Sequence, residues 1–564
     1  MAVAHDRLET EPTLARQAVS GKLPGMAPNS SVPFGPLDWA SIAVLAVASA
    51  LVFAAAPLGG DFNWSESPRN ALNGAFALDL LREMPRNPVA WAEAYYLKYP
   101  ALTILFYPPM LAGALAPFFA VLGVSHWAAM VCMAAFLFAL GVAAYAWARR
   151  WSGPPAALAA ALLLLSAPEV LLWGQQVMLE IPMLAFATAG ALLLARYGDS
   201  ARPRDVALAA VLLLCAVYTK QTAAFVAVGL GLGLVVWRGP GILRRRHIWV
   251  IIAVAIVALV PLALMQIRFG SFNITSVVYR PDSEEAKRWS VRALTWYAVR
   301  LPGMAGWPLF GLALAGLAVL AARARLWRSE ALLVLGWLVL TYAALSLISL
   351  KETRHGVPLL LPLAILAAVS LDRAAAWVGQ RAGPAHAALP LAATAVFGLN
   401  LYFNSAAGIT GYREAADRIG ALAPPAARVA FAGNRDGSFI FNVRALPRQD
   451  ITVLRVDKLF LGINIIPSLG LNPRDLPAAE VAAALNRYGV SYVVTVPQVW
   501  AEAPVMARFD QVLHSDQFEE VARIPVVGPA EERELVIYRN KGRLTDPPEQ
   551  PTVNIPAAQL TLGD

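Results

Sequence analysis

Long runs of apolar residues alternate with short polar segments from residue 39 to residue 403. A helix needs about 20 mainly apolar residues to cross the hydrocarbon core of a bilayer. The runs that approach this length number about eleven and lie near 39–57, 126–148, 155–172, 181–195, 205–219, 222–237, 248–267, 303–322, 331–350, 356–371 and 387–403. The pattern predicts a polytopic α-helical membrane protein of about eleven spans.

A further apolar run, 101–122, contains Pro108, Pro109 and Pro117. We expect a broken helix that does not fully cross, because proline removes a helix hydrogen bond. With that assignment all the arginine clusters between the spans fall on one side, which the positive-inside rule makes cytoplasmic. The clusters contain Arg149 and Arg150; Arg196, Arg202 and Arg204; Arg238, Arg244, Arg245 and Arg246; Arg323, Arg325 and Arg328; and Arg373 and Arg381.

The pattern changes after residue 403, where short β-branched segments alternate with amphipathic ones. We therefore expect a small soluble α/β domain at the C-terminal end of the membrane part. The expected organisation is a cytoplasmic N-terminal segment 1–38, a membrane domain 39–403 with a long first outer loop 58–125, an outer α/β domain 404–540, and a disordered Pro-rich tail 541–564.

Composition supports this organisation, since 58% of the residues are hydrophobic and only 15% are charged. Soluble domains carry about 25% charged residues, so a soluble enzyme and a disordered chain are both excluded. The net charge of +9 is explained by the cytoplasmic arginines, and no nucleic acid partner is expected. The two cysteines, Cys132 and Cys215, exclude a disulfide framework.

Acidic, basic and aromatic residues collect on the predicted outer side, at segments that the positive-inside rule does not explain. A single such charge is as readily an exposed loop residue as a functional one. Four outer segments that each supply an acid or a base favour a function, because ionisable groups at membrane depth are costly. The residues are Asp61, Trp64, Glu66, Arg69, Trp91, Tyr95 and Lys98 in the first loop, then Glu180, Lys220, Lys351, Glu352, Arg354 and His355.

Cations beside aromatic rings at a lipid surface suit the phosphate of a lipid-linked substrate. A nearby carboxylate can accept the proton of an attacking hydroxyl group. Together they fit the displacement of a lipid phosphate from the anomeric carbon of a sugar. The phosphate leaves as an anion that Lys and Arg stabilise, so no general acid is essential.

At this point the sequence resembles the C-type membrane glycosyltransferases of the protein O-mannosyltransferase and lipid A aminoarabinose transferase type. The resemblance rests on five motifs in order: the acidic stretch 61–70, Tyr107-Pro108-Pro109, Glu180-Ile181-Pro182, Thr219-Lys220 and Arg354-His355 before Pro358. It implies a C-type glycosyltransferase fold and an inverting transfer from a polyprenyl-phosphate-linked sugar to a periplasmic glycan, lipid or protein. It also implies a bacterial inner membrane and a periplasmic α/β domain.

The resemblance also assigns roles to individual residues. The catalytic base is either Glu66 or Asp61, because the motif here has no adjacent acidic pair, and Glu180 supplies a second acid in place of the more usual Asp. Lys220, Arg354, His355 and Lys98 are expected to bind the donor phosphate. Arg69 either binds that phosphate or pairs with Glu66. Trp64, Trp91 and Tyr95 are the expected sugar or acceptor contacts.

Three points stay open on the sequence alone. No cofactor is certain, and a divalent metal remains an alternative, although no ligand spacing defines a site. A transporter or lipid flippase is the second hypothesis; it predicts ionisable residues near mid-membrane and paired broken helices. The third hypothesis makes the α/β domain a binding module and the membrane part its anchor, for which about eleven spans are excessive.

Overall fold

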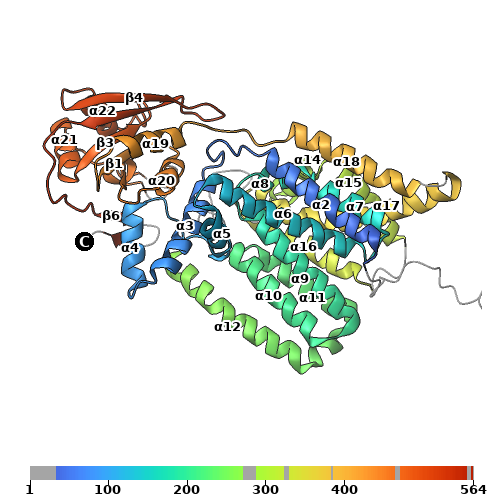
Figure 1. Ribbon diagram of the computed structural model, residues 1–564. Helices are drawn as coiled ribbons and strands as arrows, with labels where there is room; N and C mark the ends of the chain where they lie inside the picture. Colours follow the sequence, from blue (N-terminus) through green and yellow to red (C-terminus); the bar gives the residue numbers. More distant parts are fainter. Residues whose placement is uncertain are drawn as a thin grey trace, which may run out of the picture.

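The computed structural model describes residues 34–270, 287–322, 329–382, 385–463, 471–555 and 560–562. Two parts are visible in Figure 1: a body of packed helices and an α/β domain at one end of it. The helical body is built from the apolar runs, and the α/β domain begins where the pattern changes. The predicted fold class is therefore confirmed.

The helices of the body follow the predicted spans closely. They are α2 (Pro36–Ala54), α6 (His126–Ala148), α7 (Pro154–Leu165), α8 (Pro168–Gly174), α9 (Glu180–Ser200), α10 (Pro203–Thr219), α11 (Ala223–Arg238), η1 (Pro240–Arg244), α12 (Arg246–Phe269), α14 (Val291–Ala305), α15 (Trp307–Ala321), α16 (Ala331–Leu347), η4 (Thr353–Leu359), α17 (Leu360–Ala382) and α18 (Ala385–Phe403). Within the described ranges, five helices are long and apolar enough to cross a membrane, or seven if each of two bent pairs is one span. The chain is therefore a multi-pass membrane protein, and the count of eleven stays a prediction.

The two bent pairs are α7 with α8, at 64°, and α14 with α15, at 118°. In each pair the second helix begins with a proline at its first or second position, which starts a helix and cannot continue one. The bend turns α8 and α14 along the end of the body that carries the α/β domain, where both contact η4.

The Pro-interrupted run forms α5 (Met110–Leu122), whose 13 residues extend about 20 Å. That length is short of a span, as expected for this run. The helix packs on α3 (Ser67–Glu83), where Gly74 allows close approach to Leu115 and Phe119. Together with α4 (Pro88–Lys98), these helices make up the long first loop between α2 and α6.

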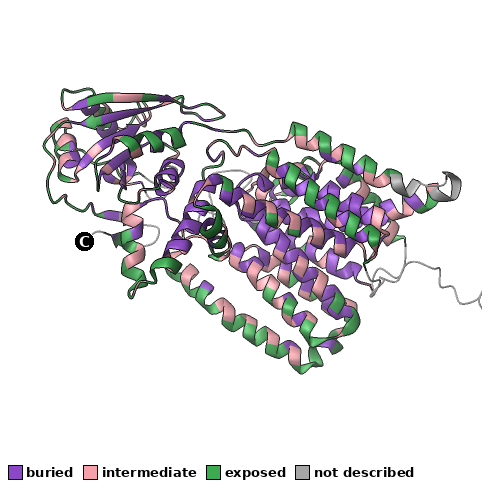
Figure 2. Cartoon of the chain, viewed as in Figure 1, coloured by how far each residue is buried: buried purple, intermediate pink, exposed green. Residues whose placement is uncertain are grey.

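At the far end of the body, buried arginines form ion pairs with carboxylates of neighbouring helices. Arg150 donates to Glu330 and to Asp199, and Arg149 donates to Asp38. Unpaired buried charges are strongly destabilising, so these contacts fasten the ends of four helices together, α2, α6, α9 and α16. Between the two ends, α7 and α9 are mostly buried, whereas α12 is mainly exposed or half-buried, with Ile248 and Leu262 as its buried residues (Figure 2).

The α/β domain contains one five-stranded sheet in the order β2-β1-β3-β5-β4. Its strands are β1 (Arg428–Ala432), β2 (Thr452–Arg455), β3 (Val490–Thr495), β4 (Phe518–Pro525) and β5 (Glu534–Asn540). β1 pairs parallel with β2 and with β3, whereas β5 pairs antiparallel with both β3 and β4. The helices are α19 (Tyr412–Leu422), α20 (Asp436–Arg444), α21 (Ala478–Arg487) and α22 (Pro504–Leu513), with a turn of π-helix, η5 (Asp457–Leu461).

The tail differs from the expectation of disorder over its described residues. Thr545 and Glu549 bond through their backbones to the end of α21. Beyond them, β6 (Val553–Ile555) pairs antiparallel with β7 (Leu560–Leu562). Val553 and Leu562 are buried against partly buried apolar side chains of α4 and its neighbours. Apolar residues spaced through a Pro-rich segment thus dock the tail on the first loop.

Candidate active site

The first loop brings Glu66 to the end of the body that faces the α/β domain. Glu66 directly precedes α3, and its carboxylate makes no cap hydrogen bond with that helix. Instead it forms an ion pair with Arg354 of η4, which also pairs with Glu352. Arg354 is largely buried, whereas Glu66 keeps about a quarter of its side chain exposed (28%). A carboxylate in such a position is held in place yet remains accessible to a substrate.

Aromatic rings complete this corner of the site. The Trp64 ring centroid lies 5.8 Å from the guanidinium carbon of Arg354. The same ring meets Trp173 of α8 edge-on, at a centroid distance of 5.2 Å. The Trp173 indole donates in turn to Glu169, 2.6 Å away. Trp64 remains 38% exposed, so one face of it can stack on a ligand.

Glu180 and Lys220 form a second ion pair at the same end. Glu180 is the first residue of α9 and Lys220 is the C-cap of α10. These two helices pack against each other along their length. The Lys220 Nζ lies 2.7 Å from Oε1 of Glu180. The other oxygen of Glu180, Oε2, is buried and has no hydrogen-bond partner among the described residues. A buried carboxylate oxygen without a donor is a position that a ligand hydroxyl can satisfy.

The two ion pairs belong to one site. Arg354 interacts electrostatically with Glu180 as well as with Glu66, and His355 does so with Lys220. Tyr107 of the Tyr-Pro-Pro element also interacts electrostatically with Glu66, Glu180 and Arg354. Burial raises the pKa of the Tyr107 hydroxyl well above its usual range, so the hydroxyl stays protonated and can donate.

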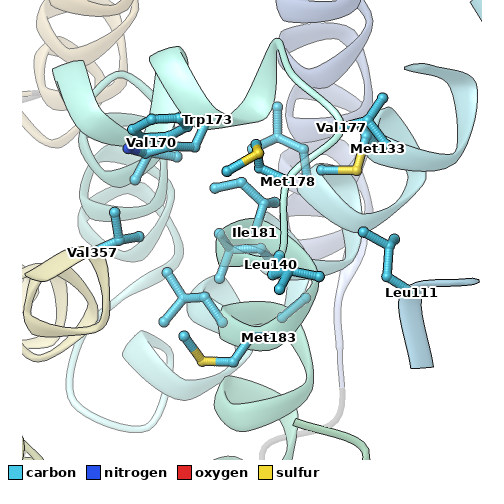
Figure 3. Packing of buried hydrophobic residues seen from close by; sticks show 14 of the residues in the cluster. Leu111, Met133, Leu140, Val170, Trp173, Val177, Met178, Ile181, Met183 and Val357 are labelled. Atoms are coloured by element: carbon cyan, nitrogen blue, oxygen red, sulfur yellow. The ribbon is translucent and has the colours of Figure 1, made fainter. Parts of the chain in front are cut away.

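Apolar packing beneath the site fixes these positions. Figure 3 shows Trp173 and Val170 of α8, Met178 of the following turn and Ile181 of α9 close together. All four are buried, and Val357 of η4 belongs to the same cluster. Because α8, α9 and η4 share this core, its large side chains fix the positions of Glu180 and Arg354, although η4 lies far from α8 and α9 in sequence.

Asp61, the alternative base, lies elsewhere. Its Oδ2 accepts from the backbone N–H groups of Tyr412 and Arg413 at the start of α19, and its Oδ1 accepts from Asn442 of α20. Asp61 is 2% exposed. Burial raises the pKa of the Asp61 carboxyl, and these three donors oppose that rise. Its contacts attach the first loop to the α/β domain.

Arg69 also faces the α/β domain, not Glu66. Its guanidinium donates to both carboxylate oxygens of Asp436, at 2.7 and 2.9 Å. Asp436 in turn pairs with Arg455, at 2.9 Å. Of the two alternatives for Arg69, the pairing with Glu66 is therefore wrong.

The remaining candidates of the first loop gather around α4. Tyr95 donates to Asp79, and Arg444 of α20 forms an ion pair with the same carboxylate. Trp91 stacks at an angle on Tyr95, with ring centroids 5.2 Å apart. The ammonium group of Lys98 lies over the ring of Tyr99, and its electrostatic partners are those of this cluster. The structure therefore separates Trp91, Tyr95 and Lys98 from Arg354 and Lys220.

Two residues of the site, Glu169 and Trp173, were not among the sequence candidates. Tyr107 and Glu352 were noted in the sequence, as part of a motif and of an outer charged turn, but received no individual role. Glu169 carried a usable signal, since it is a lone carboxylate in an apolar run, as Glu180 is. Trp173 carried none, because an interfacial tryptophan is common in any membrane protein.

The acidic side chains of the candidate site face cations. Across the parts of the chain that the structure describes, no three His, Cys, Asp or Glu side chains are arranged to hold a metal ion. The carboxylates of the site instead face Arg354 and Lys220.

Comparison with solved structures identifies the fold. ArnT from Cupriavidus metallidurans bound to undecaprenyl phosphate superposes with a TM-score of 0.61 and 16% sequence identity, covering 89% of this chain and 98% of that one. Its apo structure gives a TM-score of 0.60 at 17% identity, with 88% and 98% covered. The fold is that of the C-type membrane glycosyltransferases. The α/β domain is included, because the match extends well beyond the membrane body.

Two other C-type glycosyltransferases match less closely. Arabinofuranosyltransferase AftD from Mycobacteria has a TM-score of 0.52 at 18% identity, covering 92% of this chain and 41% of that one. The Archaeoglobus fulgidus oligosaccharyltransferase has a TM-score of 0.51 at 13% identity, covering 83% and 69%. In sequence, residues 107–264 match the family described as dolichyl-phosphate-mannose-protein mannosyltransferase. No curated protein matched the sequence.

Proposed function

We propose that the protein transfers a sugar from a polyprenyl-phosphate-linked donor to an acceptor hydroxyl group at the membrane surface. The single observation that carries the proposal is the meeting of two ion pairs, Glu66 with Arg354 and Glu180 with Lys220, at one end of the body. The fold supports it, as does the undecaprenyl phosphate bound to the similar ArnT structure.

The reaction we propose is an inverting displacement. The acceptor oxygen attacks the anomeric carbon, the bond from that carbon to the phosphate oxygen breaks, and the polyprenyl phosphate leaves. Glu66 accepts the proton of the acceptor hydroxyl. Lys220 and Arg354 stabilise the charge that develops on the departing phosphate, in a partly buried setting where such charges interact strongly.

Other residues orient the substrates. Oε2 of Glu180 accepts a hydrogen bond from a sugar hydroxyl, and the protonated Tyr107 donates one. Trp64 stacks on the sugar or the acceptor. His355, buried beside Arg354, adds a polar group to the phosphate side of the site. Asp61, Arg69, Trp91, Tyr95 and Lys98 act at the contact with the α/β domain, which keeps the first loop in its active shape.

We further propose that the site faces the periplasm from a bacterial inner membrane, with a glycan, a lipid such as lipid A, or a protein as acceptor. The arginine clusters between the spans would then be cytoplasmic. A transporter is less well supported, because the buried ion pairs of the described helices lie at helix ends and none is placed at mid-membrane.

The decisive experiment compares Glu66→Gln with Glu352→Gln, since both carboxylates pair with Arg354 and only Glu66 is proposed as the base. Purified enzyme is assayed for sugar release from a polyprenyl-phosphate donor. Glu66→Gln should lower kcat by at least about 100-fold, as expected for loss of a general base. Glu352→Gln should lose far less. Equal activity of Glu66→Gln and the unsubstituted enzyme would remove Glu66 from the mechanism.

The sugar and the acceptor are identified in cells. Mass spectrometry of the periplasmic glycans and lipid A of a deletion strain should show the loss of one sugar, which names donor and acceptor together. An unchanged envelope with altered solute uptake would instead favour transport.

A further inference from the structure

The end of the body opposite the candidate active site carries an open groove of about 650 Å³. It lies between the start of α10 and the start of α12 and is lined by Arg204, Arg246, His247 and apolar side chains of α12. Next to it, a smaller cavity of about 120 Å³ is lined by Tyr197, Arg238 and Arg245. In Figure 1 these helix ends lie far from the α/β domain. The 17 residues of α10 separate the groove from Lys220 by about 25 Å.

The charge of this region is not balanced by the protein. Arg204, Arg238, Arg245 and Arg246 are exposed, and within the described ranges none of them forms an ion pair with a carboxylate. Of the acids on the neighbouring described residues, Asp199 pairs with Arg150. Asp205 accepts a hydrogen bond from Ser200, which leaves its single negative charge against the positive charges of four arginines. Elsewhere at this end, arginines such as Arg149 and Arg150 do have carboxylate partners.

Contacts within the protein hold together the helices that form the groove and the adjoining small cavity. The Tyr197 hydroxyl and His247 Nε2 lie 2.8 Å apart and join α9 to α12. Trp237 packs against Gly198, where a Cβ would meet the indole at 2.1 Å. Arg245 reaches the carbonyl oxygen of Ala201 at 3.5 Å. These contacts hold η1 and the start of α12 against the end of α9, so the arginines surround a defined space.

Apolar surface continues from the groove along the membrane. Val250 and Ile251 line it, and α12 beyond them exposes Val254, Val257 and other large apolar side chains. A ligand that fits must therefore be anionic at one end and apolar at the other. Clusters of Lys and Arg between helices at the membrane surface bind anionic lipid headgroups, because each cation gains from the nearby phosphate.

We propose that this groove is a binding site for an anionic membrane phospholipid. Its phosphodiester would lie beside Arg204 and Arg246 in the groove, next to Arg245 of the adjoining small cavity, and its acyl chains would lie along α12. The site is separate from the donor site at the other end of the body, and it does not depend on the proposed transfer reaction. Bound lipid would fasten α12, which has few protein contacts of its own, to α9 and α10.

The test uses the full chain in nanodiscs of phosphatidylcholine with or without phosphatidylglycerol. Native mass spectrometry should show phosphatidylglycerol retained in preference to phosphatidylcholine. Arg245→Gln with Arg246→Gln should weaken that retention about tenfold or more. The matched control is Arg196→Gln with Arg202→Gln, which removes the same charge at the same end outside the groove lining and should change little.

Competition experiments distinguish the possible sources of the bound phosphate group. Soluble glycerophosphoglycerol should not compete with the lipid, because it lacks acyl chains, and undecaprenyl phosphate should compete weakly. Competition by undecaprenyl phosphate as strong as that by phosphatidylglycerol would overturn the proposal in favour of a second donor-lipid site. If the double variant does not fold, equal retention of the two phospholipids by the unsubstituted chain overturns it as well.

Discussion

The guanidinium of Arg354 meets the carboxylate of Glu66 although 288 positions separate the two residues in the chain. This contact joins the start of α3 to η4, so the first loop and the last basic turn of the body depend on each other. Arg354 is paired with Glu352 as well as with Glu66, and a further anion beside it would compete with Glu66 for the guanidinium. A donor phosphate is such an anion, and its binding would free the Glu66 carboxylate for the acceptor hydroxyl.

We expect Arg354→Gln to weaken binding of undecaprenyl phosphate at least tenfold, because a charge-assisted contact to phosphate contributes about 1.5–3 kcal/mol. Lys220→Gln should act in the same direction. Binding is measured by titration of the purified protein with the labelled lipid. Arg523→Gln is the control, since Arg523 is an exposed residue of the α/β domain that pairs with Glu520 and Glu534. Unchanged affinity in both site variants would remove these cations from the phosphate site.

Asp61→Asn should lower stability more than activity. An amide has one acceptor oxygen and places an NH₂ group against the donors that now face the carboxylate. We expect a loss of about 1–3 kcal/mol in the free energy of unfolding. Asp417→Asn, on the exposed side of α19, is the matched control and should cost little.

The measurement for Asp61→Asn is the midpoint of thermal unfolding together with sugar transfer per folded molecule. Early cleavage by a protease between α18 and α19 would show that the α/β domain has loosened from the first loop. A fall in transfer as large as that of Glu66→Gln, with an unchanged midpoint, would assign the base to Asp61 instead.

The pairing of Glu180 with Lys220 was within reach of sequence reasoning. Both residues were predicted at the outer ends of neighbouring spans, and successive antiparallel helices pack side by side. The pattern of arginines in alternate polar segments was enough to put Glu66, Glu180 and Arg354 on one side. These predictions were possible because the thickness of the bilayer sets the length of each apolar span, and the spans therefore show which polar segments share a side.

The contacts of Asp61 could not be predicted from the sequence. Its partner Asn442 lies 381 positions away in a separate domain, and nothing in either segment indicates the contact. The same holds for Arg69 with Asp436, 367 positions apart. An exposed acid and an anchoring acid look alike in a polar loop, because burial there is created only when the α/β domain docks. Glu66 and Asp61 could therefore not be told apart before the fold was known.

Close packing of α11 on α16 gives a prediction with an internal control. A Cβ at Gly229 would lie 2.4 Å from the carbonyl oxygen of Gly336, and a Cβ at Gly231 would meet nothing within 4 Å. Gly229→Ala should therefore force the helices apart and lower the unfolding midpoint, since overpacking costs about 1–3 kcal/mol. Gly231→Ala should be neutral or slightly stabilising. Equal midpoints in detergent would contradict the observed approach of the two backbones.

Lys458 of η5 should make the stability of the α/β domain vary with pH in the alkaline range. Burial, together with the nearby Arg455, lowers the pKa of its ammonium group to about 8, against about 10.4 in an unfolded chain. Between these values the unfolded chain holds a proton that the folded chain has lost. Stability should therefore rise with pH from about 8 to about 10. Below pH 8 the ammonium group of Lys458 is charged in both the folded and the unfolded chain, so folding carries the full free-energy cost of burying that charge.

Lys458→Met should remove that rise and flatten the dependence of the unfolding midpoint on pH over this window. The variant also leaves the Ile463 carbonyl oxygen without the donor that now lies 2.6 Å away, so its midpoint at neutral pH reports two opposed effects. The slope with pH isolates the titration. Lys541→Met, at an exposed position, is the control and should keep the slope of the unsubstituted protein. A slope that survives in Lys458→Met would assign the titration to another group.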